Sequence, residues 1–284
     1  MENVYRIEEE NRHYDCMVLA VNGSILRNVR DEIVQYDIDK LILISPLMND
    51  TFLNEAGKIL SGKSRISDKT CIADDARIVS DDTSSIIIDD DVVIGKGCVI
   101  IASDNLHIEK RSIIRDESSI IASNNSSVKF GAIIKIDEGI LITVKNNSHI
   151  KMSDKVKVGR YGEIGAADFG KINIGLETTF NDFLYMCSEK SLINIGKDGM
   201  FSYYIKINVG SHKLINKNDE MNITNKIPII IGNHVWCGMR GIILSDTQIG
   251  DGSVIGAPSL INKKKPSNCT CAGNPAKVLR RDIE

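Results

Sequence analysis

The chain carries an aliphatic or similarly apolar residue at every sixth position between residues 231 and 261, and this period limits the folds it can adopt. The residues at this spacing are Ile231, Cys237, Ile243, Ile249, Ile255 and Ile261. A helix repeats every 3.6 residues and a strand every second residue, so neither explains the pattern. A period of six sustained over several cycles is typical of a β-helix, in which each hexad forms one short face of a triangular coil.

Compact residues occupy a second position of the repeat, four residues after most of the aliphatic ones. They are Val235, Gly241, Thr247, Ser253 and Ser259. A tight corner leaves little room for bulk near the coil axis, so these positions are expected to mark the corners.

The same rhythm begins upstream at Ile66, Ile72 and Ile78, and the chain then repeats in longer units. Residues 100–108 (IIASDNLHI) return at residues 120–128 (IIASNNSSV), and more faintly from Leu141, so that the units lie 20 to 22 residues apart. Three hexads make 18 residues, so each of these coils is predicted to carry extra residues at one corner. The polar Asp-Asn and Asn-Asn turns are the expected places.

The N-terminal part follows a different pattern. An apolar run at residues 17–21 and another at residues 41–45 flank an amphipathic stretch at residues 24–37, which predicts one β-α-β unit. No Gly-x-Gly-x-x-Gly fingerprint is present, so dinucleotide binding has no support and a structural or substrate-orienting role is favoured. The predicted organisation is an N-terminal α/β cap at 1–62, a β-helix at 63–265 that ejects a loop at 213–228, and a C-terminal tail at 266–284.

Charge and cysteine content exclude several classes of function. A formal net charge of −3 and a pI near 6.0 argue against nucleic acid as the main partner. The 7 cysteines are odd in number and follow no disulfide framework, as expected for reduced thiols in a cytoplasmic protein. The acidic start has no apolar secretory segment, and no run approaches the length of a membrane span, so neither secretion nor membrane insertion is expected.

Three sequence motifs near the C-terminus resemble those of a known family. They are IGNHVWCGM at 231–239, IGDGSVIGA at 249–257 and AGNPAKVLRR at 272–281. In this order they resemble the hexapeptide-repeat acyltransferases of the polysaccharide and sugar O-acetyltransferase type. The resemblance covers residues 172–281 and implies a mainly β fold, a left-handed parallel β-helix with a small N-terminal α/β module. It also implies transfer of an acetyl group from acetyl-CoA.

The resemblance implies a catalytic pair. His212 lies 24 residues before Trp236, the spacing at which the family places its general base. The backbone amide of Met239 matches the family's donor to the thioester oxygen. Gly210 departs from the family, which often has an acidic residue there, so another group must orient the imidazole.

Further site residues follow from the same resemblance. Trp236 is implied to form a wall of the acetyl and acceptor pocket, with packing at a subunit seam as the simpler interpretation. Asn181 aligns with an asparagine that contacts the acceptor in the family. For His234, a structural hydrogen bond and a role in the site are equally favoured.

Coenzyme binding is implied at the C-terminal coils. The residues that align with contacts to pantetheine and phosphates are Ala257, Asn262, Lys263, Lys277 and Arg280. Pro258 replaces a glycine usual in the family at this end. The coenzyme slot of the family lies between neighbouring β-helices, which implies a homotrimer, and no metal site is expected.

The sequence therefore predicts a CoA-dependent O-acetyltransferase acting on a sugar hydroxyl of a surface polysaccharide or its precursor. One alternative is N-acetylation of a nucleotide-linked amino sugar, for which the N-terminal module gives some support. Another is a non-catalytic β-helix that serves as a scaffold or binding module. Tests of coenzyme binding and of different acceptors distinguish these hypotheses.

Overall fold

We analysed a computed structural model of the 284-residue chain. It describes residues 17–20, 41–44, 58–60, 63–80, 84–209 and 227–281. The chain divides into two compact units, Met1–Glu55 and Ala56–Glu284. The predicted boundary at residue 62 lies a few residues beyond this division.

The first unit contains two paired strands. Strands β1 (Met17–Ala20) and β2 (Leu41–Ile44) lie parallel, with Met17 opposite Leu41. Both predicted apolar runs therefore form strands, as expected for a β-α-β unit. The predicted helical stretch at residues 24–37 lies outside the described residues.

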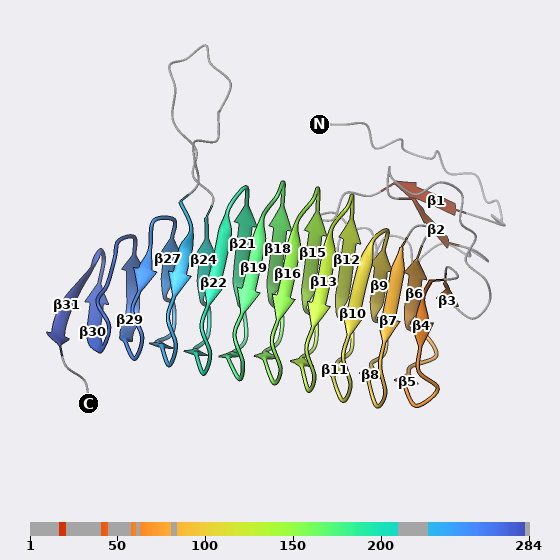
Figure 1. The fold of residues 1–284 in the computed structure, drawn as a ribbon, viewed down its shortest axis with the longest axis horizontal. Coiled ribbons are helices and arrows are strands. Elements are labelled where there is room, and N and C mark those ends of the chain that lie inside the picture. The colour runs from red at the N-terminus through yellow and green to blue at the C-terminus, as the bar shows by residue number, and fades with distance from the viewer. Residues whose placement is uncertain are drawn as a thin grey trace, which may run out of the picture. The chain divides into compact units, whose positions relative to one another are not determined.

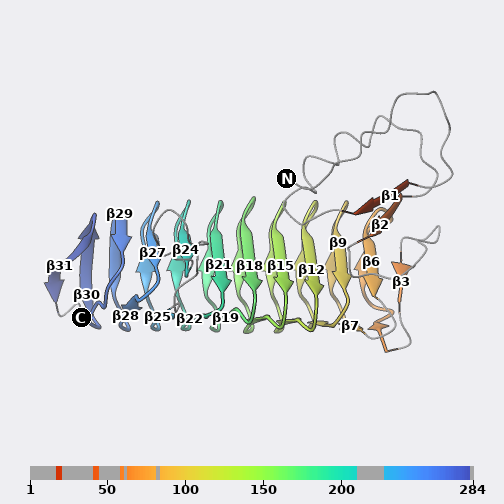
Figure 2. The same ribbon diagram turned by 90° about the horizontal axis from the view of Figure 1, so that it is seen from above.

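The second unit is a β-helix of parallel strands, seen as successive coils in Figures 1 and 2. Each complete coil contributes one strand to each of three faces. Face 1 contains β5 (Cys71–Ile72), β8 (Val93–Ile94), β11 (Ile113–Ile114), β14 (Lys135–Ile136), β17 (Lys157–Val158), β20 (Thr179–Phe180), β23 (Met200–Phe201), β26 (Trp236–Cys237), the start of β29 (Val254–Ile261) and β30 (Cys269–Gly273).

Face 2 follows face 1 along each coil. It contains β3 (Lys58–Ile59), β6 (Arg77–Ser80), β9 (Val99–Ala102), β12 (Ser119–Ser123), β15 (Leu141–Lys145), β18 (Glu163–Ala167), β21 (Tyr185–Glu189), β24 (Lys206–Asn208), β27 (Ile242–Leu244) and the end of β29. Face 3 closes the coil with β4 (Arg65–Ile66), β7 (Ser85–Ile88), β10 (Asn105–Ile108), β13 (Ser127–Phe130), β16 (His149–Met152), β19 (Lys171–Ile174), β22 (Leu192–Ile195), β25 (Ile229–Ile231) and β28 (Gln248–Ile249).

The residues that set the six-residue period fill the interior. Ile231, Cys237, Ile243, Ile249, Ile255 and Ile261 are each at most 2% exposed. They join one continuous hydrophobic core, because each coil buries its inward side chains against the coils on either side. No α-helix occurs among the described residues, so the mainly β, left-handed parallel β-helix predicted from the sequence is confirmed.

The compact residues of the repeat lie at buried corners, as expected. Ser253 is fully buried, and its hydroxyl donates to the Pro266 carbonyl at 2.8 Å. A buried hydroxyl needs such a partner, since an unsatisfied polar group inside the coil would be costly. Other coils hold buried aliphatic side chains at the same position, such as Ile134, Ile140 and Leu184, so a corner accepts either a compact polar residue with a partner or an aliphatic one.

The extra residues of the longer units also lie where the sequence predicts. Asn124 and Asn146 have left-handed φ angles of 58°, a conformation that asparagine tolerates better than most residues. The Asn124 amide donates to the Asn146 side-chain oxygen at 2.7 Å, and Asn146 donates to Asp168 at the same distance. These turns form a hydrogen-bonded ladder across neighbouring coils.

The C-terminal end differs from every other coil. Strand β31 (Ala276–Arg281) runs antiparallel to β30, with Ala276 opposite Gly273 and Arg281 opposite Cys269. This hairpin forms the last described coil, at the end marked C in Figure 1. The predicted loop at 213–228 lies almost wholly outside the described residues. No helix long and apolar enough to cross a membrane occurs in the described part of the chain.

Candidate active site

Trp236 projects outward from face 1 beside another large apolar side chain. It is 51% exposed, and its partner in register on the preceding coil, Met200, is 60% exposed. Inward residues of the same strands are buried, because successive side chains of a strand point to opposite faces. The two exposed side chains together form an apolar surface on face 1 that a ligand or another chain could cover.

Met239 lies at the corner between faces 1 and 2, three residues beyond Trp236. Its side chain is 45% exposed, and the residues on either side are tied to neighbouring coils: Gly238 donates to Ile255 and Arg240 donates to Tyr203. Within the described part of the chain, no hydrogen bond from the Met239 amide is found. The backbone around this donor is fixed while the donor itself stays open.

Two other coils of face 1 satisfy the corresponding amide with a carboxylate from the next coil, whereas among the described residues no hydrogen bond is found from the corresponding amides of Glu138, Asp182 and Tyr203. The Arg160 amide donates to an Asp182 carboxylate oxygen at 2.9 Å, and the Lys96 amide donates to Asp116 at the same distance. A Cβ placed on Gly238 would meet Ala257, just as one placed on Gly159 would meet Asp182. Ala257 thus stands where these two coils have a carboxylate, and it has no oxygen to offer Met239.

Asn181 lies on the same edge of face 1. Its amide donates to the Phe201 carbonyl at 2.9 Å, and Phe201 pairs in turn with Cys237. Asn181 is therefore two coils away from Gly238 along one corner, or about 10 Å at the usual strand spacing. The structure brings Asn181, Trp236 and Met239 onto one side of the β-helix.

His234 lies at the other end of the short face 1 strand. It has a left-handed φ of 53° at the corner between faces 3 and 1, and its Nδ1 lies 3.5 Å from Asp198. Asp198 belongs to the preceding coil, so this contact gives His234 a structural partner. Its suggested role in acceptor binding stays a prediction.

His212 lies outside the described residues, so its position stays a prediction. The last described residue before the gap, Val209, follows β24 at the edge between faces 2 and 3. Trp236 lies on face 1, which meets face 2 at the opposite edge of face 2. The described chain stops at Val209 on one edge of face 2 and presents Met239 on the other.

The residues predicted to bind coenzyme fall on the same two edges. Ala257 lies near the start of β29, and Lys277 and Arg280 lie on the terminal hairpin opposite Ala272 and Thr270. Asn262 and Lys263 follow the other end of β29, about 17 Å from Ala257 at strand rise. All except Asn262 are exposed, and Asn262 is half-buried.

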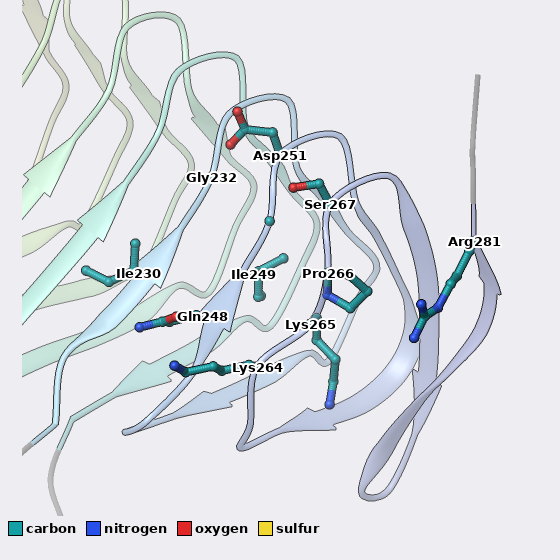
Figure 3. A pocket seen from close by; sticks show the side chains of 11 residues that line it. Ile230, Gly232, Gln248, Ile249, Asp251, Lys264, Lys265, Pro266, Ser267 and Arg281 are labelled. Atoms are coloured by element: carbon teal, nitrogen blue, oxygen red, sulfur yellow. The ribbon is translucent and has the colours of Figure 1, made fainter.

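An open pocket of about 570 Å³ lies at the C-terminal end of face 3, and sequence reasoning did not assign it (Figure 3). Lys264, Lys265 and Arg281 line it together with Gln248 and residues of the neighbouring coils. The run of three lysines was the available signal, but it did not reveal that Arg281 joins the same pocket.

Cys237 is next to Trp236 in sequence but points into the core. Burial raises the pKa of its thiol to about 12, so it stays protonated and is unsuited to act as a nucleophile. No cluster of three or more histidine, cysteine or acidic residues able to hold a metal occurs in the described ranges.

Part of the chain is similar in sequence to known acetyltransferases. It is 32% identical over 119 residues to a colanic acid biosynthesis acetyltransferase of Escherichia coli K12, covering 40% of this chain and 64% of that protein. It is 37% identical over 91 residues to the galactoside O-acetyltransferase of the same organism, covering 31% and 43%. The polysialic acid O-acetyltransferase of E. coli O1:K1 is 28% identical over 123 residues, covering 43% and 40%.

These relatives confirm the resemblance to the sugar O-acetyltransferases that the three sequence motifs suggested. The matched region spans 40 to 64% of the length of these relatives. No protein-family profile matches the chain.

Solved structures with a similar fold include a polysialic acid-specific acetyltransferase, with a TM-score of 0.49 and 24% identity over 74% of this chain and 88% of the other. A hexapeptide-repeat acetyltransferase of Vibrio cholerae solved with acetyl-coenzyme A has a TM-score of 0.36 and 26% identity, over 46% and 69%.

Proposed function

We propose that this chain, which is related to the hexapeptide-repeat sugar O-acetyltransferases, transfers an acetyl group from acetyl-CoA to a hydroxyl of a polysaccharide or its precursor. The observation that carries the proposal is the open amide of Met239, three residues from the exposed Trp236. Relatives named for galactoside, colanic acid and polysialic acid support a sugar acceptor.

The proposed reaction needs a base and an oxyanion donor. His212 takes the proton from the acceptor hydroxyl, whose oxygen attacks the carbonyl carbon of the thioester. The Met239 amide donates a hydrogen bond to the oxygen that becomes negative in the tetrahedral intermediate. The intermediate then collapses, the carbon–sulfur bond breaks and CoA leaves as its thiol, taking the proton from the imidazole.

The fixed backbone around Met239 supports the oxyanion role. Neighbouring residues are held by bonds to Ile255 and Tyr203, so the amide needs no reorganisation as charge develops. Trp236 provides apolar surface on the same side of the β-helix, where it would exclude water from the acetyl group. Asn181, on the same corner, is proposed to hydrogen-bond the acceptor sugar, and the role of His234 is secondary because Asp198 engages it.

The distribution of coenzyme residues supports a homotrimer. Ala257, Lys277 and Arg280 lie toward the Met239 edge of face 2, whereas Asn262 and Lys263 lie at the edge where the described chain stops at Val209. We infer that the coenzyme lies between two protomers, so that one supplies the Met239 edge and its neighbour supplies the other. His212 and Trp236 would then come from different subunits.

Transfer of radiolabelled acetyl from acetyl-CoA to a panel of sugars tests the proposal. The panel pairs hydroxyl-only glycosides and oligosaccharides with amino sugars, free and nucleotide-linked. We expect transfer to hydroxyl acceptors, with His212→Ala lowering kcat by at least two orders of magnitude while CoA binding persists.

The same experiment separates the alternatives. Preference for the amino sugars would favour N-acetylation, and no binding of CoA at millimolar concentration would favour a non-catalytic scaffold. Near-normal turnover of His212→Ala would remove that residue from the mechanism. Calorimetry of both proteins with CoA shows that a loss of rate does not arise from a loss of coenzyme binding.

A further inference from the structure

We propose that the open pocket at the C-terminal end of face 3 binds the phosphates of a nucleoside diphosphate, at a place separate from the coenzyme. The proposal goes beyond the acetyl-transfer function and does not depend on it. Three features of the pocket carry the inference: its cationic lining, its partly apolar surface and its separation from the residues assigned to CoA.

The pocket is built by an irregular segment that lies against β28. The Lys265 amide donates to the Gln248 carbonyl at 2.7 Å, and the Gly250 amide donates to the Lys265 carbonyl at 3.1 Å. A side chain on Gly250 would collide with Ser267, so a glycine is what allows this segment to approach so closely. The backbone that presents the lysines is therefore anchored on both sides.

Cationic side chains from two distant parts of the sequence line this opening, with Lys264 and Arg281 on opposite sides of Lys265 (Figure 3). Lys264 and Lys265 come from the segment after β29, and Arg281 comes from the end of β31. None of the three has an ion-pair partner among the described residues. Such unneutralised charge favours a ligand with more than one negative group, and phosphate oxygens suit both ammonium and guanidinium donors.

The single carboxylate of the pocket is already engaged. Asp251 accepts hydrogen bonds from the Asn233 backbone amide at 2.8 Å and from its side-chain amide at 3.2 Å. These bonds hold Asp251 toward the neighbouring coil, on the upper side of the view in Figure 3, away from Lys264 and Lys265. The cations are left available to an anion.

Part of the pocket's lining is apolar. Ile230 and Pro266 offer apolar surface (Figure 3), whereas the side chain of Ile249 is buried in the core. An inorganic anion would gain nothing from this surface, whereas a nucleoside can lay its base or ribose on it. The volume, about 570 Å³, lies within the usual range for small-molecule sites. The apolar part of the lining and the cationic side chains together fit a nucleoside diphosphate better than free phosphate.

The pocket shares no residue with the set predicted to bind coenzyme. Its lining includes Lys264 and Arg281, whereas the coenzyme set includes their neighbours Lys263 and Arg280. Successive side chains of a strand point to opposite sides, so Arg280 and Arg281 are expected to diverge. Two phosphate-binding surfaces can therefore lie side by side at this end of the chain.

Calorimetric titration of the full-length protein with UDP tests the site. We expect UDP to bind with a dissociation constant that rises roughly tenfold or more in the double variant Lys264→Ala/Lys265→Ala and in Arg281→Ala. Added NaCl should weaken the binding, since the contacts are ionic and exposed. The matched control is Lys151→Ala/Lys171→Ala, which removes the same charge from exposed positions of face 3 several coils away.

Pyrophosphate and CoA distinguish the sources of phosphate. Tighter binding of UDP than of pyrophosphate, unchanged at saturating CoA, supports the proposal. Absence of UDP binding, equal weakening in the control variant, or competitive displacement of UDP by CoA would each overturn it. The last result would mean that the pocket is part of the coenzyme site.

The acetyl-transfer proposal and the nucleoside diphosphate proposal can be contradicted independently of each other. His212→Ala is expected to abolish acetyl transfer and leave UDP titration unchanged. Arg281→Ala is expected to lose UDP binding and to keep normal acetyl transfer to a simple glycoside. This result would support UDP binding in the pocket and would leave the catalytic assignment unchanged.

Discussion

At the scale of single residues, the corner beside Met239 combines an open donor with an exposed indole. In two coils of face 1 the next coil supplies an aspartate to the equivalent amide, as Asp182 does for Arg160. Ala257 holds that position beside Met239 and has no oxygen to offer. Among the described residues, open amides also occur at the corners of Asp182 and Tyr203, so the proximity of Trp236 is what distinguishes Met239.

Supplying the Met239 amide with a side-chain acceptor, as in the coils of Lys96 and Arg160, should abolish the oxyanion site. Ala257→Asn is expected to place an oxygen on the Met239 amide and to lower kcat by about 10²–10³, the usual cost of losing one oxyanion donor. Ala257→Val adds similar bulk without an acceptor and should retain most of the turnover rate. Steady-state kinetics with both variants checks this, and equal losses would show that bulk, not hydrogen bonding, is responsible.

The ionisation of the buried Cys237 thiol should affect stability only at alkaline pH. Its pKa is raised to about 12 in the folded chain, so above the ordinary thiol pKa the unfolded state loses a proton that the folded state keeps. Stability is then lost as pH rises, by about 1.4 kcal/mol per pH unit between the two pKa values.

Denaturant unfolding at pH 8, 9 and 10 measures this effect. Cys237→Ala should lower stability at every pH through lost packing, yet show a shallower decline above pH 9 than the unchanged protein. Cys71→Ala, at an exposed thiol, serves as the control and should leave the slope unaltered. Parallel declines in all three proteins would contradict the assignment.

At the scale of elements, an aromatic side chain contributes differently to stability on a face and at a corner. Phe180 and Phe201 stack inside successive coils with centroids 4.7 Å apart, and both are buried. Phe183 and Tyr204 also stack, at 4.6 Å, but they are exposed and have left-handed φ angles of 66° and 60°. Corner rings thus combine a favourable contact with backbone strain.

Substitutions should separate these two situations. Phe180→Ala is expected to destabilise the protein by about 3–5 kcal/mol, because it leaves a cavity in the core. Phe183→Asn exchanges a ring contact of about 0.5–1.5 kcal/mol for relief of a left-handed strain of about 1–2 kcal/mol. Thermal unfolding should therefore show a large fall in Tm for Phe180→Ala and a small change of either sign for Phe183→Asn.

Elements also show how far the sequence predicts the structure. The period of six identified inward residues such as Ile243, because only inward positions demand a constant apolar character. The Asn124 and Asn146 turns were predictable because the repeating units are longer than three hexads and the extra residues are polar. The pocket of Lys264 and Arg281 was not, since their proximity depends on the antiparallel turn of β31 and no local pattern encodes it.

Site residues were predictable only in part, and for a related reason. Trp236 and Met239 were found from a family motif, yet nothing in that motif indicates that Ala257 leaves the Met239 amide open. That fact requires the register between coils. His212 lies outside the described residues, so its assignment still depends on sequence spacing alone.

At the scale of the β-helix, the terminal hairpin protects an exposed edge. Strand β29 pairs with β27 on face 2 and with β26 and β30 on face 1. Removing residues 264–284 would leave the face 1 part of β29 paired with β26 on one edge and unpaired on the other. Unpaired strand edges recruit other strands. We expect the truncated protein to form higher oligomers at concentrations where the full chain keeps a fixed size, as measured by light scattering. A truncated protein of unchanged size would show that the hairpin is dispensable for solubility.

The reversed direction of β31 also limits how the molecule can change in length. A further coil added after Arg281 would meet a strand running against it, so the parallel stacking of the other coils could not continue there. Central coils face no such barrier, because each presents the same backbone direction to both neighbours. Duplicating one of them, as the similar segments at 100–108 and 120–128 illustrate, would lengthen the body while leaving the terminal chemistry intact.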